Sequence, residues 1–311
     1  MALALLPFVL GCVVIAGAAE TDQYLTWDME LADSAPHFNA YLNGEIEAFV
    51  EKMNRRSRPV ADAGELTEEL YRHLFAGLHA SRLRNWLKNA DEVDRHPGDD
   101  LSDWEYQRLS IFREPAFPFI LPMAQTIRVG DVYFGIDKIG HMFGFGRRYL
   151  QIYQRARAAG DSHDAAVDRV LRWGIQHERS VVGKLVDGVF SHADLEANYQ
   201  GFRLALAFSS GGRPLFFQEA GLWRYRGGLD IRAYITPDFD ESYNTSDYAP
   251  WRGKRVLPIV ETRYAPLAVS PAVTARFARY ERDYTPSLSK RFVDAWLDGQ
   301  RADAVNAVAR K

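Results

Sequence analysis

Apolar residues recur every three or four positions through several long stretches of the chain. The first stretch follows Ser34 and the nearby Pro36, two residues typical of a helix start. Its apolar positions are Phe38, Leu42, Ile46, Phe49 and Met53. This spacing matches the 3.6-residue period of an amphipathic helix. A second helical stretch is predicted from about residue 65 to residue 90, with leucines at 66, 70, 74 and 78 in register.

The remaining pattern predicts more helix and little sheet. The runs TIRV and VYFG flank a Gly-Asp turn and predict a small β hairpin. Three helices are then expected over about 137–158, 162–186 and 191–208, each opened by Asp or Ser. From 209 to about 262, short aromatic runs alternate with glycine turns and predict an irregular β-rich excursion. Helices return in 263–311, where Pro286 separates two segments.

These elements predict a mainly α fold, a helical bundle core with a small β hairpin and a β-rich irregular excursion. The 311 residues are 47% hydrophobic, which is enough to bury a substantial core. We expect a single mainly helical domain over residues 20–311, with its helical core ending at about 208.

Residues 2–19 form an apolar run that ends in small residues, as a secretory signal peptide does. Cleavage is expected near Ala18 or Ala19, which gives a signal peptide of residues 1–19. Two alternatives remain open: a lipobox at residues 9–12 that would make Cys12 a lipid anchor, and a retained anchor helix. With such a leader the mature chain is expected to be exported, periplasmic or secreted. Because Cys12 is the only cysteine, it is expected to have no disulfides. Membrane association is expected only in the two alternatives.

Charge excludes one class of partner. The chain has 38 Lys and Arg against 41 Asp and Glu, a net charge of -3, and has no basic stripe interleaved with aromatic residues. Nucleic-acid binding, which needs such a footprint, is therefore not expected.

The helix predicted from residue 137 carries polar residues where its apolar face should be. On a helical wheel, Lys138 falls inside the apolar arc, and Asp137 and His141 lie at its edge. The spacings i,i+4 and i,i+3 let the three side-chain tips converge. Gly140 and Gly144, with Gly146, thin this helix and usually admit another backbone closely.

The next helix repeats the anomaly at Glu178. Its apolar stripe is Leu171, Ile175, Val182 and Leu185, and Glu178 occupies a position within it. A buried carboxylate without a partner is costly, so Glu178 should find a cation or a donor. Lys138 and His141 are the obvious candidates, and a structural ion pair is the alternative.

The third helix adds Asp194 and Asn198. Ser191 and Asp194 have the spacing of a capping box, which explains both residues without function. Asn198 is a poor helix former in a helix interior and therefore should reach a partner. Asp194, Asn198 and Gly201 share one face, and Gly201 would let that face approach another helix.

The ordered set from Asp137 to Gly201 resembles the pattern of the VanZ-like family and related small periplasmic lipoproteins. The similarity rests on DKxxH at 137–141, Glu178, and SxxDLxANxxG at 191–201, about a fifth of the chain. VanZ-like proteins are membrane-embedded, whereas these helices carry arginines at 147, 148, 155, 169 and 172. The biochemical activity of that group is unclear, so the resemblance implies a site and not a reaction.

Two functions follow from these polar residues. In the first, an exported hydrolase or transferase acts on a cell-envelope glycan or lipid. Its acid and base would be Glu178 and Asp194, with His141 as proton shuttle or ligand, and Lys138 and Asn198 would hold an anionic or carbonyl group. In the second, the polar cluster of a non-catalytic envelope protein only fixes helix packing.

Metal binding remains a third possibility, with Asp137, His141 and Glu178 as ligands, and no cofactor is identified. The acidic segment TPDFDESYNTSDY at 236–248 could hold calcium but has no EF-hand spacing, and we interpret it as a solvated loop.

Overall fold

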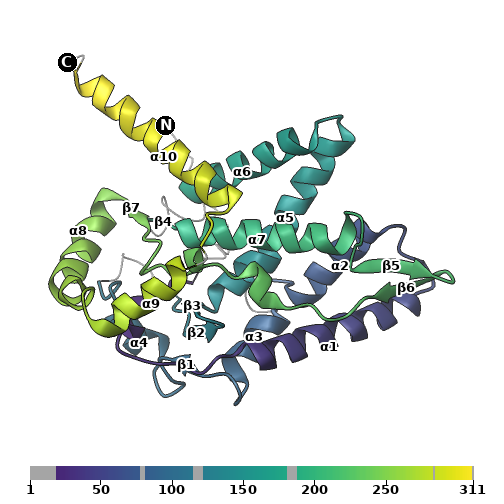
Figure 1. Cartoon of the computed structure of the whole chain (residues 1–311), viewed down its shortest axis with the longest axis horizontal. Coiled ribbons are helices and arrows are strands. Elements are labelled where there is room, and N and C mark those ends of the chain that lie inside the picture. The colour runs from purple at the N-terminus through teal and green to yellow at the C-terminus, as the bar shows by residue number, and fades with distance from the viewer. Residues whose placement is uncertain (1–18, 78–80, 115–121, 181–187, 283, 310–311) are drawn as a thin grey trace, which may run out of the picture.

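The computed structural model describes residues 19–77, 81–114, 122–180, 188–282 and 284–309. The predicted signal peptide, apart from Ala19, and the lipobox alternative at Cys12 lie outside the described residues. The predicted mainly α fold is confirmed, with short antiparallel strand pairs between the helices (Figure 1).

The N-terminal part begins with a short 3-10 turn, Gln23–Thr26, and the helix α1, Ala35–Asn54. The apolar residues that predicted α1 are all buried in it. The helical stretch predicted over 65–90 is two helices, α2 (Ala63–Leu74) and α3 (Arg82–Asn89). Phe75 leaves the helical conformation and pairs with Ser81 in a β-bridge. Gly77, at φ 153°, takes a backbone angle that a helix does not allow and that glycine adopts most readily.

The predicted hairpin is confirmed as β2 (Thr126–Val129) and β3 (Val132–Gly135), paired from Thr126 with Gly135 to Val129 with Val132. Gly130 in its turn has a φ of +62°. Two elements precede it: β1 (Arg95–His96), which pairs with β2 as the outer strand, and the helix α4 (Asp103–Leu109).

The three central helices begin within one residue of their predicted starts. They are α5 (Asp137–Ala158), α6 (His163–Arg179) and α7 (His192–Ser209). The end predicted for α6 lies partly outside the described residues. The strand β4 (Val189–Phe190) leads into α7 and pairs with β7 (Asp247–Tyr248).

Glycines bring α5 and α7 into backbone contact. A Cβ on Gly201 would lie 1.9 Å from the carbonyl oxygen of Met142, and one on Gly146 would lie 2.8 Å from the carbonyl carbon of Gly201. The close approach expected at Gly146 and Gly201 is therefore present. Gly140 and Gly144 instead make room for the ring of Phe75, a side chain and not a backbone.

The excursion predicted as β-rich is only partly so. It contains the hairpin of β5 (Phe216–Glu219) and β6 (Leu222–Tyr225), then the 3-10 turns Ile231–Tyr234 and Pro237–Phe239. It ends in the helix α8 (Pro250–Ile259), which continues through a π turn, Val260–Tyr264, and a 3-10 turn, Ala265–Leu267. The prediction missed α8, whose start at Pro250 and buried Val256 and Ile259 are ordinary helix features. The two C-terminal helices are confirmed as α9 (Pro271–Glu281) and α10 (Leu288–Ala309).

These elements surround α7, which crosses the middle of the view in Figure 1. One large cluster of buried apolar side chains runs from Ala35 in α1 to Tyr280 in α9, and a second surrounds Trp27 and Tyr264. Among the described residues, no helix is both long enough and apolar enough to cross a membrane.

Candidate functional site

Lys138, in the first turn of α5, lies at the centre of a buried group of charges. Only 1% of its surface is exposed. Its Nζ lies 2.6 Å from Oδ2 of Asp137, 2.8 Å from Oδ1 of Asp194 and 2.8 Å from Oε1 of Glu241. Burial opposes an ammonium ion, but these three carboxylates outweigh it and hold the pKa of Lys138 well above its usual value. Lys138 is therefore a permanent positive charge.

Asp137 connects this charge to the start of the described chain. Its Oδ1 accepts a hydrogen bond of 2.8 Å from Thr21 Oγ1. Burial acts to raise the pKa of Asp137, but Lys138 and His141 oppose it and the net shift is downward. Gly135 is required beside this contact, because a Cβ there would lie 1.9 Å from Thr21 Oγ1 and 2.1 Å from Asp137 Oδ1.

His141 lies one turn further along α5 and faces two residues of α7. Its Nδ1 is 3.1 Å from Asn198 Oδ1, and its Nε2 is 3.3 Å from Asp194 Oδ2. Its ring stacks on Phe145 with 5.2 Å between centroids. Asp194 thus bridges the ammonium of Lys138 and the imidazole of His141. The convergence of these side chains is as the sequence pattern predicts.

Glu178, at the end of α6, is buried as predicted but has a different direct partner. Its Oε1 accepts a hydrogen bond of 3.1 Å from the backbone N–H of Ser191. Burial raises the pKa of Glu178 well above its usual value, and the negative charge of Asp194 adds to the shift. Lys138 acts on Glu178 only as a smaller opposing charge, because its three ion pairs go to other carboxylates. Glu178 therefore holds its proton more tightly than an ordinary carboxyl group does.

The capping box expected at Ser191 is half formed. Ser191 Oγ accepts from the backbone N–H of Asp194, which is an ordinary N-cap. The reciprocal bond to the backbone N–H of Ser191 comes from Glu178 and not from Asp194. The Asp194 carboxylate is thereby available to Lys138 and His141.

Glu241 belongs to this group, and the sequence pattern did not identify it. Its Oε1 accepts from Lys138 Nζ and from Ser191 Oγ, both at 2.8 Å. Burial raises the pKa of Glu241 to about 7, against the opposing charge of Lys138. The solvated loop predicted here is wrong, since Asp238, Asp240 and Glu241 are all buried. The buried Phe239 within the acidic segment was the signal that could have revealed it.

We call the following residues the Lys138 cluster: Asp137, Lys138, His141, Glu178, Asp194, Asn198 and Glu241. It contains four carboxyl groups but only one ammonium and one imidazole, so the acidic groups outnumber the basic groups. Nearby Asp22, which accepts from the backbone N–H groups of Tyr24 and Ile111, is a fifth buried acid, and burial raises its pKa to about 7. Some of these acids therefore exchange protons near neutral pH.

A cation could compete for one part of the Lys138 cluster. Asp137, His141 and Asp194 each offer one ligand atom, and these atoms lie within 4.8 Å of one another. Glu178, a ligand in the sequence-based possibility, is not in this set, because its carboxylate faces the Ser191 backbone. The ammonium of Lys138 contacts both aspartates of the set, so a metal ion would have to displace it or be repelled by it.

Comparison with known proteins adds no further identification: no family model, curated protein or solved structure matches the chain. The resemblance to the VanZ-like family stays a prediction from the motif alone.

Proposed function

We propose that the protein is an exported cell-envelope enzyme, a hydrolase or transferase that uses the Lys138 cluster for acid–base catalysis on an envelope glycan or lipid. The observation that carries this proposal is the surplus of buried carboxyl groups. Glu178 has a raised pKa, whereas Asp194, about one helical turn into α7, is paired with an ammonium and an imidazole. Carboxyl groups in such different environments are the usual acid and base of hydrolytic sites.

The geometry gives each residue a role in this proposal. Glu178, whose pKa is raised by burial, would donate a proton to a leaving group, and Asp194 with His141 would accept one from the attacking group. Lys138 holds Asp194 in place and would offer positive charge to an anionic or carbonyl oxygen. Asn198 orients the His141 ring through Nδ1.

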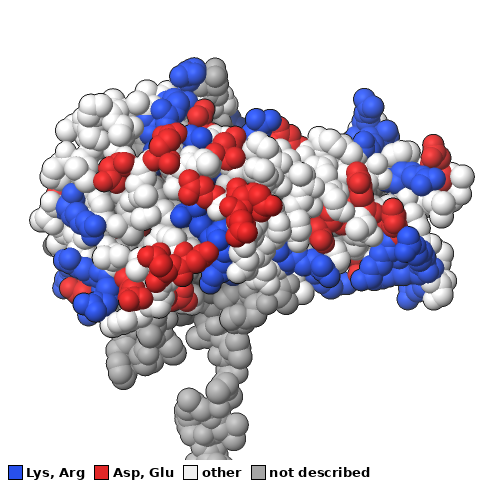
Figure 2. Space-filling view, turned by 90° about the horizontal axis from the view of Figure 1, so that it is seen from below, with Lys and Arg blue, Asp and Glu red and all other residues white. Residues whose placement is uncertain are grey.

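The mixed surface charge is compatible with such a substrate and supports leaving nucleic acid out of the proposal. Figure 2 shows basic and acidic side chains interspersed over one face of the molecule. A polyanion-binding face would instead gather Lys and Arg.

A structural role is the second candidate, and one observation favours it. Every side chain of the Lys138 cluster is buried, and Lys138 makes three ion pairs. Such a network can fix how three helices pack without any chemistry. The two candidate functions predict different results for a substitution: a loss of turnover if the cluster is catalytic, and a loss of stability if it is structural.

Two substitutions separate them. His141→Ala and Glu178→Gln should each lower turnover on isolated cell-envelope material by about 10²- to 10⁴-fold, the usual contribution of a general acid or base. Gln at position 178 can still accept the hydrogen bond from the Ser191 backbone. Turnover is measured as released reducing sugar or fatty acid, beside thermal melts of each variant. Glu196→Gln is the matched control, because Glu196 is a buried acid of α7 outside the Lys138 cluster.

Catalysis predicts lost turnover with a nearly unchanged melting temperature. If the melting temperature instead falls enough to account for all lost activity, the structural role replaces the enzyme. If both the melting temperature and the turnover are unchanged, the Lys138 cluster is not a functional site.

Export is the second part of the proposal and rests on the apolar run at residues 2–19. Mass spectrometry of the protein recovered from cells should show a chain that lacks about the first 19 residues. A chain that starts at Met1 would contradict cleavage, and a diacylglycerol adduct on Cys12 would select the lipobox alternative.

A further inference from the structure

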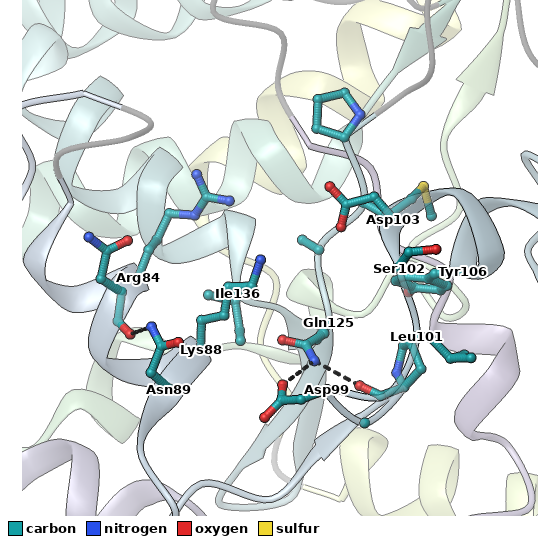
Figure 3. A pocket seen from close by; sticks show the side chains of 16 residues that line it. Arg84, Lys88, Asn89, Asp99, Leu101, Ser102, Asp103, Tyr106, Gln125 and Ile136 are labelled. Atoms are coloured by element: carbon teal, nitrogen blue, oxygen red, sulfur yellow. Dashed lines mark hydrogen bonds between the residues drawn. The ribbon is translucent and has the colours of Figure 1, made fainter.

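A pocket of about 610 Å³ opens between α3, the segment 97–103 and the start of α5 (Figure 3). Pockets of about 300 to 1,000 Å³ are the usual size for small-molecule ligands. Arg84 and Lys88 extend from α3 on one side, and Asp103 of α4 faces them from the other. Gln125 lies between the two sides, near the floor in this view.

The inner wall of this pocket adjoins the Lys138 cluster. Ile136 lines the pocket and directly precedes Asp137. Tyr106 lines it too, and its hydroxyl oxygen accepts a 3.2 Å hydrogen bond from the backbone N–H of Asp22. Burial lowers the pKa of Arg84, and the charge of Asp137 opposes that shift, so Arg84 is within electrostatic range of the cluster. A ligand in the pocket would lie beside the first turn of α5.

The lining is polar in a way that suits a sugar. Gln125 Nε2 donates to Pro97 O at 2.9 Å and to Asp99 Oδ1 at 3.1 Å. Its Oε1 is buried and has no hydrogen-bond donor among the described residues, which leaves one acceptor unused beside the pocket. The exposed carboxylate of Asp103 offers another acceptor on the opposite side. Planar amide and carboxylate groups of this kind bind hydroxyl groups through directed hydrogen bonds.

The two cations lie together on α3 and give that side of the pocket a preference for an anionic group, although the acids Asp99 and Asp103 also line the pocket. Arg84 and Lys88 are four residues apart, on one face of α3, and both line the pocket. Arginine binds carboxylate and phosphate groups through two parallel hydrogen bonds, and lysine acts on them as a point charge. An acyl chain would suit this lining less well, because the charged groups of Arg84, Lys88 and Asp103 would lose hydration beside it.

We infer that this pocket binds an anionic saccharide, with its carboxylate or phosphate at Arg84 and Lys88 and its hydroxyl groups at Gln125 and Asp103. This inference rests on the proposed function and narrows its substrate class from glycan or lipid to a charged glycan.

Binding and turnover are measured separately to test it. Isothermal titration calorimetry on the full chain would use a disaccharide that contains a uronic acid, glucose 1-phosphate, cellobiose as the neutral match, and inorganic phosphate. The uronic acid or the sugar phosphate should bind about tenfold or more tightly than cellobiose, which corresponds to one charge-assisted contact. Whichever of these two sugars binds more tightly shows whether the preferred anionic group is a carboxylate or a phosphate.

Variants locate the binding. Lys88→Gln removes an exposed charge and should weaken the anionic sugar about tenfold without changing the melting temperature. Gln125→Leu should weaken cellobiose and the anionic sugar alike, since it removes the acceptor for hydroxyl groups. Lys52→Gln, an exposed lysine in the last turn of α1, is the matched control and should change nothing.

Several results would overturn the inference: no binding of any sugar, equal binding of cellobiose and the anionic sugars, or inorganic phosphate binding as tightly as glucose 1-phosphate. Unchanged affinity in Lys88→Gln would also overturn it.

His141→Ala should keep sugar affinity, because His141 is not among the lining residues. If the wild-type protein binds the sugar but shows no turnover, the proposed enzyme is refuted and the saccharide-binding pocket is retained. If it shows turnover but binds no sugar, the pocket is refuted and the enzyme is retained.

Discussion

Helix α7 buries an acid on each of two sides, and the protein stabilises them differently. Asp194 contacts the ammonium of Lys138 and the imidazole of His141. Glu196, two residues later and therefore on the other side of the helix, accepts from neutral donors only: Gln200 at 2.6 Å, Ser287 at 2.6 Å and Thr236 at 3.2 Å. Burial raises the pKa of Glu196 to about 7 although these three donors oppose it.

The difference shows what packing alone requires. A buried carboxyl group between helices needs only neutral donors, as at Glu196, and it then accepts a proton near neutral pH. The Lys138 cluster has in addition a fixed positive charge, an imidazole and three further acids. Helix packing does not demand that surplus, and the surplus is therefore the main physical reason to expect a functional site.

Removal of the central cation should give the largest effect. In Lys138→Met, Asp137, Asp194 and Glu241 lose their shared partner, and breaking such buried pairs costs about 3 to 5 kcal/mol. Urea unfolding at pH 7 measures the loss in free energy of unfolding. The loss should shrink at pH 5, where the carboxyl groups can take up protons.

Glu196→Gln is the control on the other side of α7. It should cost about 1 kcal/mol or less, because the amide oxygen can still accept from neutral donors. Equal losses for the two variants would break the comparison, since both acids would then be ordinary packing elements.

The raised pKa values also predict how stability depends on pH. The pKa of Glu241 rises from 4.5 to about 7 on folding, so the folded protein holds a proton that the unfolded chain releases in this range. The resulting stabilisation is complete below pH 4.5 and is lost as the pH rises through 7. Each such group contributes at most about 1.4 kcal/mol per pH unit. Asp22 and Glu196 act in the same direction, because both also reach a pKa of about 7.

Glu241→Gln should therefore flatten the decline in the free energy of unfolding between pH 4.5 and 7, measured by urea unfolding at several pH values. Glu196→Gln should flatten it by a similar share and leave turnover unchanged. A slope that neither variant alters would contradict the raised pKa values. A stability that rises over this range would also contradict them, because acids with lowered pKa values, such as Asp137, change protonation only below their ordinary pKa of 3.8.

The local part of this site was predictable from sequence, and its distant part was not. Asp137, Lys138 and His141 stood out because helical periodicity places them on or beside an apolar face, and the same periodicity selected Asp194 and Asn198. Thr21 and Glu241 could not be found this way. They contact Asp137 and Lys138 from 116 and 103 residues away, in segments without regular periodicity.

The errors in the predicted secondary structure have the same cause, which is contact with residues distant in the sequence. The starts of the three central helices were predicted to within one residue because their apolar stripes are long. Phe75 ended a predicted helix through its packing against glycines of α5, and α8 is a ten-residue helix within a segment of aromatic runs and turns. Both depend on tertiary contacts that local pattern does not encode.

Helix α7 touches α5 most closely where Gly201 contacts Met142, so a tilt of α7 would turn about this point. Asp194 lies seven residues before this point, or about 10 Å along the axis at 1.5 Å per residue. A tilt of about 5° there would displace the Asp194 carboxylate by about 1 Å, enough to lengthen its contacts with Lys138 and His141 together. A single methyl group added at Gly201 would therefore lengthen the contacts of Asp194 with Lys138 and His141, although it touches none of these residues.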